Sequence, residues 1–441
     1  MSKNNENNTS TKLSAGLVPK LRFPEFKNDG EWKSNSLGNI YAFITTNSFS
    51  RDDLNYTNGE VKNIHYGDIH TKFSTLFDIT KENVPFINET IPLDKFKKEN
   101  YCKEGDIIFA DASEDLKDVG KSIELFNLNN EKLLSGLHTL LARQINSEFV
   151  IGFGAYLFLN DRIRKQIQRE SQGAKVLGIS AKRLSGIKLF YPEKHKEQGK
   201  IVNCLSSLDD LIKNENLKFE VLLRQKTGVI QQLLPNNIQD MQNIRFPEFQ
   251  NSKSWKETTL GEIADYENGK AHEQDIDDSG EFVVVNSKFI SSDGEVKKFT
   301  NTPFCLAKKG DILMVLSDVP NGKAIAKCFL VEEDNRYTVN QRICKITPSN
   351  LNSKILYYLL NRNPYFLAFD DGVKQTNLRK EDVLNCPLMI PEDPKEQEKI
   401  ADTLSSVDDL IKAQIEKLEA LQLHKKGLLQ GLFPNVNEVI E

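Results

Sequence analysis

Basic and amide side chains gather in two short loops, each placed just after a glycine and before a turn of helix. The loops read "QGAKVLGISAKR" from Gln172 and "DGVKQTNLRK" from Asp371. A glycine lets backbone approach a phosphate closely, lysines release counterions when they bind phosphates, and Gln, Asn or Arg can address base edges. The loops therefore predict contacts to nucleic acid, against the ordinary alternative of solvated helix starts. The candidates are Lys175, Lys182, Arg183, Lys374, Gln375, Asn377, Arg379 and Lys380.

Two Gly-Lys loops and two short polar segments are weaker candidates for the same chemistry. The loops contain Lys121 and Lys323, and each follows a turn and strand of the type "KEGDIIFA" or "KKGDILMV". The polar segments lie around His138 and at Asn340-Gln341-Arg342. A surface position in ordinary contact with water is the favoured explanation for each of these.

Several matches to catalytic motifs fail when their context is considered. "FVIGFG" at Phe149–Gly154 resembles a methyltransferase glycine motif, but the corresponding "LNSKIL" in the second half has no glycine. "NPYF" at Asn363 lacks the second proline of an adenine-methylase motif. "GKS" at Gly120 has no glycine five residues earlier, so it is not a phosphate-binding P-loop. The Cys and His residues form no metal-ligand spacing. We predict no catalytic residue and no metal site.

The elements that position these loops are repeated within the chain. "RFPEF......W....LG.I" occurs at Arg22–Ile40 and again at Arg245–Ile263. A second phrase, "PEKHKEQGKIVNCLSSLDDLIK", returns as "PEDPKEQEKIADTLSSVDDLIK". Between the phrases lie two dissimilar stretches, Gly38–Pro192 and Gly261–Pro391, which we interpret as divergent copies of one small α/β domain. An internal repeat of this kind indicates a symmetric scaffold that presents two different recognition surfaces.

The second repeated phrase begins a long heptad pattern in each copy. Apolar residues alternate at spacings of four and three from Ile201 to Leu233 and from Ile400 to Leu432, and a proline precedes and follows each stretch. Such a narrow stripe is typical of a coiled-coil helix that packs against one partner helix, and a proline cannot continue a helix. The nearest partner is the other copy. Antiparallel packing would place Ile201 near Leu432 and Leu233 near Ile400.

Two lysines interrupt the apolar stripes, and the antiparallel register suggests a role for them. Lys226 would pair with Asp408 or Asp409, and Lys425 with Asp209 or Asp210. These reciprocal charge pairs would fix the register and direction of the two helices. Equally, both lysines could extend their ammonium groups into water.

Bulk properties exclude several classes of protein. The chain has 441 residues and a net charge of −5, so nucleic-acid contact must come from local basic clusters rather than from the overall field. No apolar run approaches the ~20 residues that a membrane span needs. The six cysteines are scattered, which favours free thiols in a reducing cytoplasm. The polar N-terminus is not of signal-peptide type.

These observations define a domain plan. It comprises a disordered polar tail (1–20), a first recognition domain (21–192), a first long helix (193–235), a linker (236–244), a second recognition domain (245–391), a second long helix (392–434) and a C-terminal tail (435–441). We expect a mixed α/β fold in which two homologous domains are separated by two long antiparallel coiled-coil helices related by a pseudo-twofold repeat.

The duplicated "PE...EQ.KI...L..LDDLIK" helix and the repeated domain resemble the specificity subunit of a type I restriction–modification system, over nearly all of the chain after about Lys20. The resemblance implies a non-catalytic chain whose two target-recognition domains each read half of a bipartite, asymmetric site in double-stranded DNA. It also implies that the paired helices bind two methyltransferase subunits and that restriction subunits join the complex. S-adenosylmethionine would bind the methyltransferase subunit, and this chain would bind no cofactor.

Two other functions stay open from the residues alone. One is a self-contained DNA methyltransferase, which methyl transfer by the purified chain would support. The other is a coiled-coil adaptor that binds only proteins. Binding of random DNA in the presence of partner subunits would separate the adaptor from a DNA reader.

Overall fold

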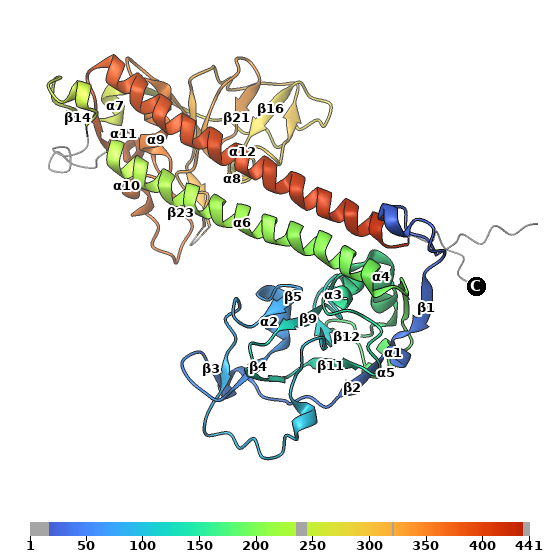
Figure 1. Cartoon of the computed structure of the whole chain (residues 1–441). Helices are drawn as coiled ribbons and strands as arrows, with labels where there is room; N and C mark the ends of the chain where they lie inside the picture. The colour runs from blue at the N-terminus through green and yellow to red at the C-terminus, as the bar shows by residue number, and fades with distance from the viewer. Residues whose placement is uncertain (1–16, 235–244, 320–321, 435–441) are drawn as a thin grey trace, which may run out of the picture. The chain divides into compact units, whose positions relative to one another are not determined.

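The computed structural model describes residues 17–234, 245–319 and 322–434, which form two compact units (Figure 1). The first unit comprises residues 1–215 and 417–441, and the second comprises residues 216–416. Two long helices, α6 (His195–Leu233) and α12 (Pro394–Leu432), each contribute to both units. The expected linker and C-terminal tail lie outside the described residues, as does the expected N-terminal tail up to residue 16. The mixed α/β class with an internal repeat is confirmed.

The first unit contains two sheets, and buried apolar side chains from both sheets form one shared layer. One sheet has the strand order β2-β11-β7-β9-β5, and the other, β10-β4-β6-β3, includes the parallel pair β4 and β10. Helix α3 packs against β9. The bounds are β2 Tyr41–Ile44, β3 Leu54–Asn55, β4 Val61–Ile64, α2 Tyr66–Thr71, β5 Leu76–Asp78, β6 Phe86–Ile87, β7 Ile107–Ala110, β9 Ser122–Asn127, β10 Lys132–Ser135, β11 Thr139–Gln144, α3 Phe153–Leu159 and α4 Asp161–Glu170.

The second unit repeats this plan with fewer strands. Its sheets have the orders β15-β22-β18-β20 and β17-β16-β21, and β16 and β21 form the matching parallel pair. Helix α9 packs against β20 as α3 does against β9. The bounds are β15 Ala264–Asn268, β16 Phe282–Val285, α8 Ser287–Ser291, β17 Phe299–Thr300, β18 Ile312–Val315, β20 Cys328–Leu330, β21 Tyr337–Val339, β22 Ile343–Pro348, α9 Ser353–Leu360 and α10 Pro364–Leu367.

Short elements close each unit in the same way. β1 pairs with β13 and β8 with β12 in the first unit, as β14 pairs with β24 and β19 with β23 in the second. The bounds are β1 Lys33–Ser36, α1 Leu37–Ile40, β8 Ala112–Ser113, β12 Leu177–Gly178, α5 Ala181–Ser185, β13 Lys188–Tyr191, β14 Lys256–Thr259, α7 Leu260–Ile263, β19 Ser317–Asp318, β23 Thr376–Asn377, α11 Lys380–Leu384 and β24 Pro387–Ile390, with 3-10 turns at Pro24–Phe26, Arg51–Asp53, Lys98–Asn100 and Pro247–Phe249.

The central strand of each unit is covered by apolar side chains on both of its faces. Every residue of β7 is buried, with Ile107 and Phe109 in one apolar cluster and Ile108 and Ala110 in another. Successive side chains of a strand point to opposite faces, so β7 is covered on both sides and its sequence, IIFA, is apolar throughout. The strand β18, ILMV, divides its side chains between two clusters in the same manner.

The repeated sequence phrases meet as a buried ion pair at the start of each long helix. In the first unit, Arg22 Nε and Nη2 each lie 2.8 Å from a carboxylate oxygen of Glu197, and Trp32 Nε1 donates to the same carboxylate at 3.3 Å. The second unit repeats the arrangement with Arg245, Glu396 and Trp255 (Nε1 at 3.3 Å). Both glutamates are buried, so each needs the two-pronged guanidinium to be tolerated there. The phrases "RFPEF…W" and "PE…EQ" are therefore two halves of one anchor.

Within each unit, a segment of α6 packs antiparallel against a segment of α12 (Figure 1). Ile201 and Leu432 belong to one apolar cluster in the first unit, where Lys425 also forms an ion pair with Asp209. In the second unit, Leu233 packs against the cluster that contains Ile400, and Lys226 Nζ lies 2.6 Å from Asp408 Oδ1. The beginning of one helix therefore meets the end of the other, as the heptad register predicts. Among the described residues, none of the helices has the length and apolar character needed to span a membrane.

Candidate nucleic-acid interface

Backbone hydrogen bonds tie three loops together in each unit, and we call this assembly the loop edge. In the first unit, Ile179 N donates to Asp111 O at 2.8 Å and Asp111 N donates to His138 O at 3.0 Å. In the second unit, Leu378 N donates to Leu316 O at 2.8 Å and Leu316 N donates to Arg342 O at 2.9 Å. The loop edge comprises residues 111–113, 136–138 and 172–179 in the first unit, and 316–318, 340–342 and 371–378 in the second.

One lysine occupies the same position in both loop edges. Lys175 follows Gly173 and Lys374 follows Gly372, and both glycines have positive φ values, 136° and 70°. Both lysine side chains are exposed. A glycine at this position allows a left-handed turn that an L residue would enter at a cost, so the turn holds the lysine outward. These two side chains are the clearest shared candidates for phosphate contact.

The residues that follow the shared lysine differ between the units. In the second unit, Gln375 Nε2 donates to Ser317 Oγ at 2.7 Å, and Asn377 lies in β23 beside it. The corresponding residues of the first unit are Val176 and Gly178, which carry no side-chain hydrogen-bonding group. At these two positions, amide groups that could read base edges are therefore present in the second unit and missing from the first.

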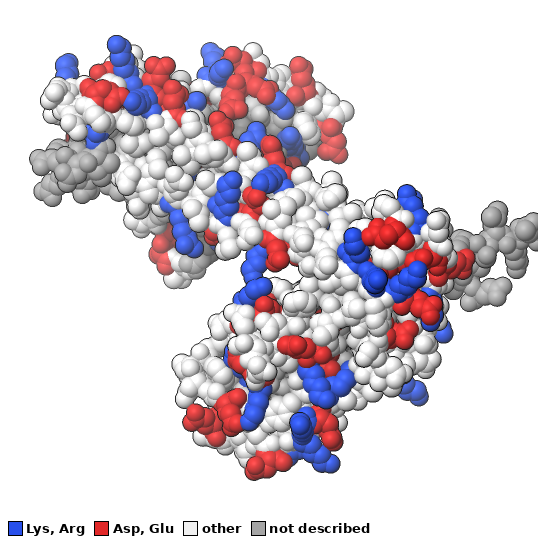
Figure 2. Space-filling view, in the orientation of Figure 1, with Lys and Arg blue, Asp and Glu red and all other residues white. Residues whose placement is uncertain are grey.

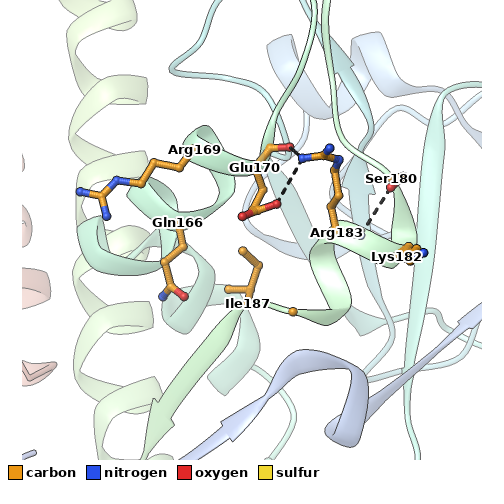
Figure 3. A pocket seen from close by; sticks show the side chains of 8 residues that line it. Gln166, Arg169, Glu170, Ser180, Lys182, Arg183 and Ile187 are labelled. Atoms are coloured by element: carbon orange, nitrogen blue, oxygen red, sulfur yellow. Dashed lines mark hydrogen bonds and ion pairs between the residues drawn. The ribbon is translucent and has the colours of Figure 1, made fainter. Parts of the chain in front are cut away.

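The basic pair Lys182 and Arg183 belongs to an open polar hollow between α4 and α5 (Figure 3). Arg183 Nη1 donates to the backbone oxygen of Glu170 at 3.1 Å and lies 3.3 Å from its carboxylate, so the guanidinium turns inward, while Lys182 is exposed. The corresponding positions of α11 hold acidic residues, Glu381 and Asp382. This basic pair is a feature of the first unit alone.

Arg379 and Lys380 begin α11 in the second unit. Arg379 is 81% exposed, and its Nε lies 3.7 Å from Asp382 Oδ2, which makes a loose pair. Lys380 Nζ lies 5.7 Å from the centre of the Tyr266 ring, within the range of a cation–π contact. Both cations are accessible and neither is held by a buried partner.

The two Gly-Lys loops are not equivalent in space. Lys121 Nζ donates to His70 O at 2.7 Å, at the end of α2. Its structural counterpart is Lys327, which donates to Ser291 O at the end of α8 at 3.3 Å, while Gly120 and Ala326 share a left-handed backbone with φ values of 64° and 53°. A lysine at a helix C-terminus stabilises the last carbonyls. Lys121 is thus a helix-end contact, and Lys323 is an exposed residue of a different loop, in which Asp318 accepts hydrogen bonds from backbone nitrogens.

A cluster of aromatic and imidazole rings beside the first loop edge is not evident from the sequence. The rings of Tyr66 and His138 lie 5.3 Å apart, and those of Tyr66 and His65 lie 4.6 Å apart. His65 Nδ1 accepts from Gly67 N at 3.2 Å, and burial lowers the pKa of His65 to about 4, so its ring is neutral at pH 7. His138 Nδ1 lies 3.1 Å from Asp111 Oδ1, and burial raises the pKa of that carboxyl. The parallel pairing of β4 with β10 brings these segments together.

On the face shown in Figure 2, charge is mixed rather than sorted by sign, and Lys and Arg side chains alternate with Asp and Glu side chains over each unit. Such a face supplies little long-range attraction for DNA, so binding of DNA there would depend on local groups. No group of three or more His, Cys, Asp or Glu side chains in the described part of the chain is arranged to hold a metal ion.

Comparisons with known proteins identify the family. The family described as "Type I restriction modification DNA specificity domain" matches residues 29–223 and 252–420, once for each unit's recognition domain, and the chain belongs to it. The chain is 24% identical over 299 residues to the type I restriction enzyme MjaVIII specificity subunit of Methanocaldococcus jannaschii, covering 63% of this chain and 69% of that one. It is 23% identical over 418 residues to the putative MjaX specificity subunit of the same organism, covering 91% and 93%.

Solved structures show the same fold. The S subunit of a type I restriction–modification system from M. genitalium matches 96% of this chain and all of its own length, with a TM-score of 0.60 and 16% identity. A chain from a study of complex assembly in the type I restriction–modification system matches with a TM-score of 0.53 and 14% identity, covering 92% and 98%. The resemblance noted in the sequence is confirmed at the level of family and fold.

Proposed function

We propose that this chain is the sequence-specific DNA-binding subunit of a type I restriction–modification complex and that it reads a bipartite, asymmetric site. The observation that carries the proposal is the loop edge, which has one backbone frame in two copies and different side chains on each. A copied frame with altered side chains is what two related readers of two different half-sites need.

The paired helices support a fixed separation between the two half-sites. Each recognition domain is anchored to the start of a long helix by a buried Arg–Glu pair, and ion pairs join the helices within each unit. Two linked readers gain affinity because binding of the first raises the effective concentration of the second. Half-sites about one helical turn apart would let both readers approach one face of the duplex.

The helices also carry apolar side chains that the described part of the chain does not cover. They are Leu211 and Leu423 in the first unit and Leu217, Val221, Leu223, Leu410 and Ile415 in the second, with exposures from 38% to 72%. Exposed apolar residues on a helix are favourable contact points for another protein. They support the proposal that two methyltransferase subunits bind here, with restriction subunits joining that complex.

In this scheme the chain itself performs no chemistry, and S-adenosylmethionine binds the methyltransferase partner. We place the complex in the cytoplasm, where its DNA target is found. The two remaining functions, a self-contained methyltransferase and an adaptor that binds only proteins, gain no support from the family match.

Exchange of one recognition domain tests the proposal. Residues Gly38–Pro192 would be replaced by the corresponding segment of another family member, and the methylated sites of the host genome would be sequenced. One half-site should change while the other half-site and the gap stay as in the parent. The reciprocal exchange of Gly261–Pro391 is the matched control and should change the opposite half. A change in both halves, or methylation without sequence preference, would contradict the proposal.

A further inference from the structure

One position of the loop edge has the same backbone setting in both units but a different side chain. His138 and Arg342 each follow the second strand of the parallel pair, β10 or β21, and each carbonyl accepts the hydrogen bond that closes the loop edge, at 3.0 Å and 2.9 Å. Some other copied positions keep their residue type. Lys121 and Lys327, for example, both contact a helix end. A copied frame with a changed residue marks a place where the units differ in what they contact.

Arg342 faces an open hollow with basic walls. Its side chain is exposed and lines this hollow together with Lys288, Lys298 and Asn340. The one carboxylate among the residues that line the hollow is that of Glu273, and it accepts hydrogen bonds from the amides of Asn340 at 3.4 Å and Gln341 at 3.1 Å. No hydrogen bond or ion pair joins the guanidinium of Arg342 to another described residue, so it retains its donors for a ligand. An arginine in this state can donate two parallel hydrogen bonds to one planar acceptor.

His138 presents a different set of groups at the matching position. Its Nδ1 lies 3.1 Å from Asp111 Oδ1, and its ring lies edge-on to Tyr66 at 5.3 Å. In the neutral tautomer that donates Nδ1–H to the carboxylate, Nε2 carries a lone pair and accepts a hydrogen bond. The two contacts fix the ring while about half of the His138 side chain, 52%, stays exposed. A fixed acceptor suits an amino group as its partner.

We propose, resting on the proposed function, that His138 and Arg342 are specificity-determining residues, one for each half-site. Arg342 donates to O6 and N7 of a guanine in the major groove, the commonest bidentate contact of an arginine with a base. His138 Nε2 accepts from an exocyclic amino group, N6 of adenine or N4 of cytosine, which the major groove also displays. The shared lysines, Lys175 and Lys374, contact phosphates beside these bases without reading them.

Genome-wide sequencing of methylated sites in cells that carry variant alleles tests this assignment. With Arg342→Ala, one base position of one half-site should lose its preference for guanine by about tenfold to hundredfold, because a bidentate contact discriminates by about 1–3 kcal/mol. The other half-site and the gap should be unchanged. With His138→Ala, one position of the opposite half-site should relax, so each variant is the control for the other.

A third variant covers the case in which Arg342→Ala fails to accumulate in the cell. Arg342→Lys keeps the charge and loses the two-pronged geometry, so it should relax the same guanine position to a smaller extent. Unaltered motifs in the Arg342 variants, or a loss that is equal at all sequences, would overturn the assignment and leave the proposed function standing. A wild-type chain that directs methylation to no bipartite motif would instead overturn the proposed function.

Discussion

The hydroxyl of Tyr156 donates a hydrogen bond of 2.9 Å to Asp209 Oδ2, and this aspartate also holds Lys425 of the other long helix. The second unit has the same arrangement, with Tyr358 donating to Asp408 at 2.6 Å and Lys226 on the other side. One aspartate in each unit therefore joins a recognition domain to both long helices. Burial raises the pKa of each tyrosine, and the carboxylate raises it further. Both hydroxyls therefore stay protonated.

Removal of one hydroxyl should loosen this junction. Tyr358→Phe deletes a hydrogen bond to a charged group and is expected to lower the free energy of unfolding by about 1.5–3 kcal/mol. Urea unfolding followed by circular dichroism measures the change. Tyr357→Phe is the matched control, because the neighbouring hydroxyl makes no hydrogen bond among the described residues. Equal losses in the two variants would show that the hydrogen bond is not the cause.

The charge pair between the helices should be detected as coupling. Lys226→Asp and Asp408→Lys are each expected to destabilise the second unit, and the double exchange should recover part of the loss. Both side chains are about 30% exposed, at 28% and 33%, so the recovered coupling is expected to be about 0.5–1 kcal/mol. Losses that simply add in a double-mutant cycle of urea unfolding would reject a role of this pair in fixing the register.

The buried anchor should matter far more than the exposed pair beside it. Glu197→Gln leaves the Arg22 guanidinium, 6% exposed, without its counterion and is expected to cost about 3–5 kcal/mol. Glu25→Gln removes an exposed pair with Lys200, which lies on α6 as Glu197 does, and it should cost far less because water screens that pair. Thermal unfolding of the two variants provides the comparison. Similar melting temperatures for both would contradict the anchor role.

Stability should depend on pH through Glu124. This carboxyl accepts hydrogen bonds of 2.7 Å from Gly152 N and Ala155 N, yet its burial raises its pKa to about 7, from an ordinary value of 4.5. The folded state therefore binds a proton that the unfolded state releases between pH 4.5 and 7, so stability is expected to fall as pH rises through that window.

Glu124→Gln should remove this contribution, because an amide does not titrate. The difference in unfolding free energy between variant and parent is expected to shift in favour of the variant by up to about 3 kcal/mol from acid to neutral pH. Urea unfolding at a series of pH values measures it. Glu114→Gln, at an exposed loop position, serves as the control and should show a constant difference. A constant difference for Glu124→Gln as well would show that Glu124 is not the source of the pH dependence.

The shared lysines should affect salt dependence and not sequence preference. Lys175→Ala and Lys374→Ala are each expected to weaken DNA binding by the assembled complex uniformly and to reduce the slope of log K against log salt by about one. Gel shifts at several salt concentrations measure the slope. Lys354→Ala, at the exposed first turn of α9 and outside the loop edge, should leave it unchanged. A changed preference among DNA sequences would assign the lysines a reading role.

Much of the architecture could be predicted from the sequence because it is encoded in repeats and periods. The heptad stripes determine which faces of α6 and α12 are apolar, and antiparallel packing then brings Lys226 to Asp408 and Lys425 to Asp209. The doubled phrases indicate two similar domains, although not that Glu197 and Arg22 close one anchor, since nothing local links residues so far apart. The boundary between the two units also falls within each long helix, because each domain packs on only part of that helix.

The loop edge could be predicted only in part. The loops at 172–179 and 371–378 stand out by their glycine and lysine content, but their contact with residues 111–113 and 316–318 depends on strand pairing between distant segments. The same limit explains the mismatch of Lys121 with Lys323. The dipeptide Gly-Lys occurs in both halves of the sequence. In the structure, however, Lys121 corresponds to Lys327, because each follows a residue with left-handed backbone, Gly120 or Ala326.

The two anchors have one further consequence. The ion pairs Arg22–Glu197 and Arg245–Glu396 have the same geometry. A domain removed from one helix could therefore form the same ion pair with the other helix. Transposition of the two domains would then reverse the order of the two half-sites in the target. A lineage could thus acquire a new DNA target by rearranging its existing recognition domains.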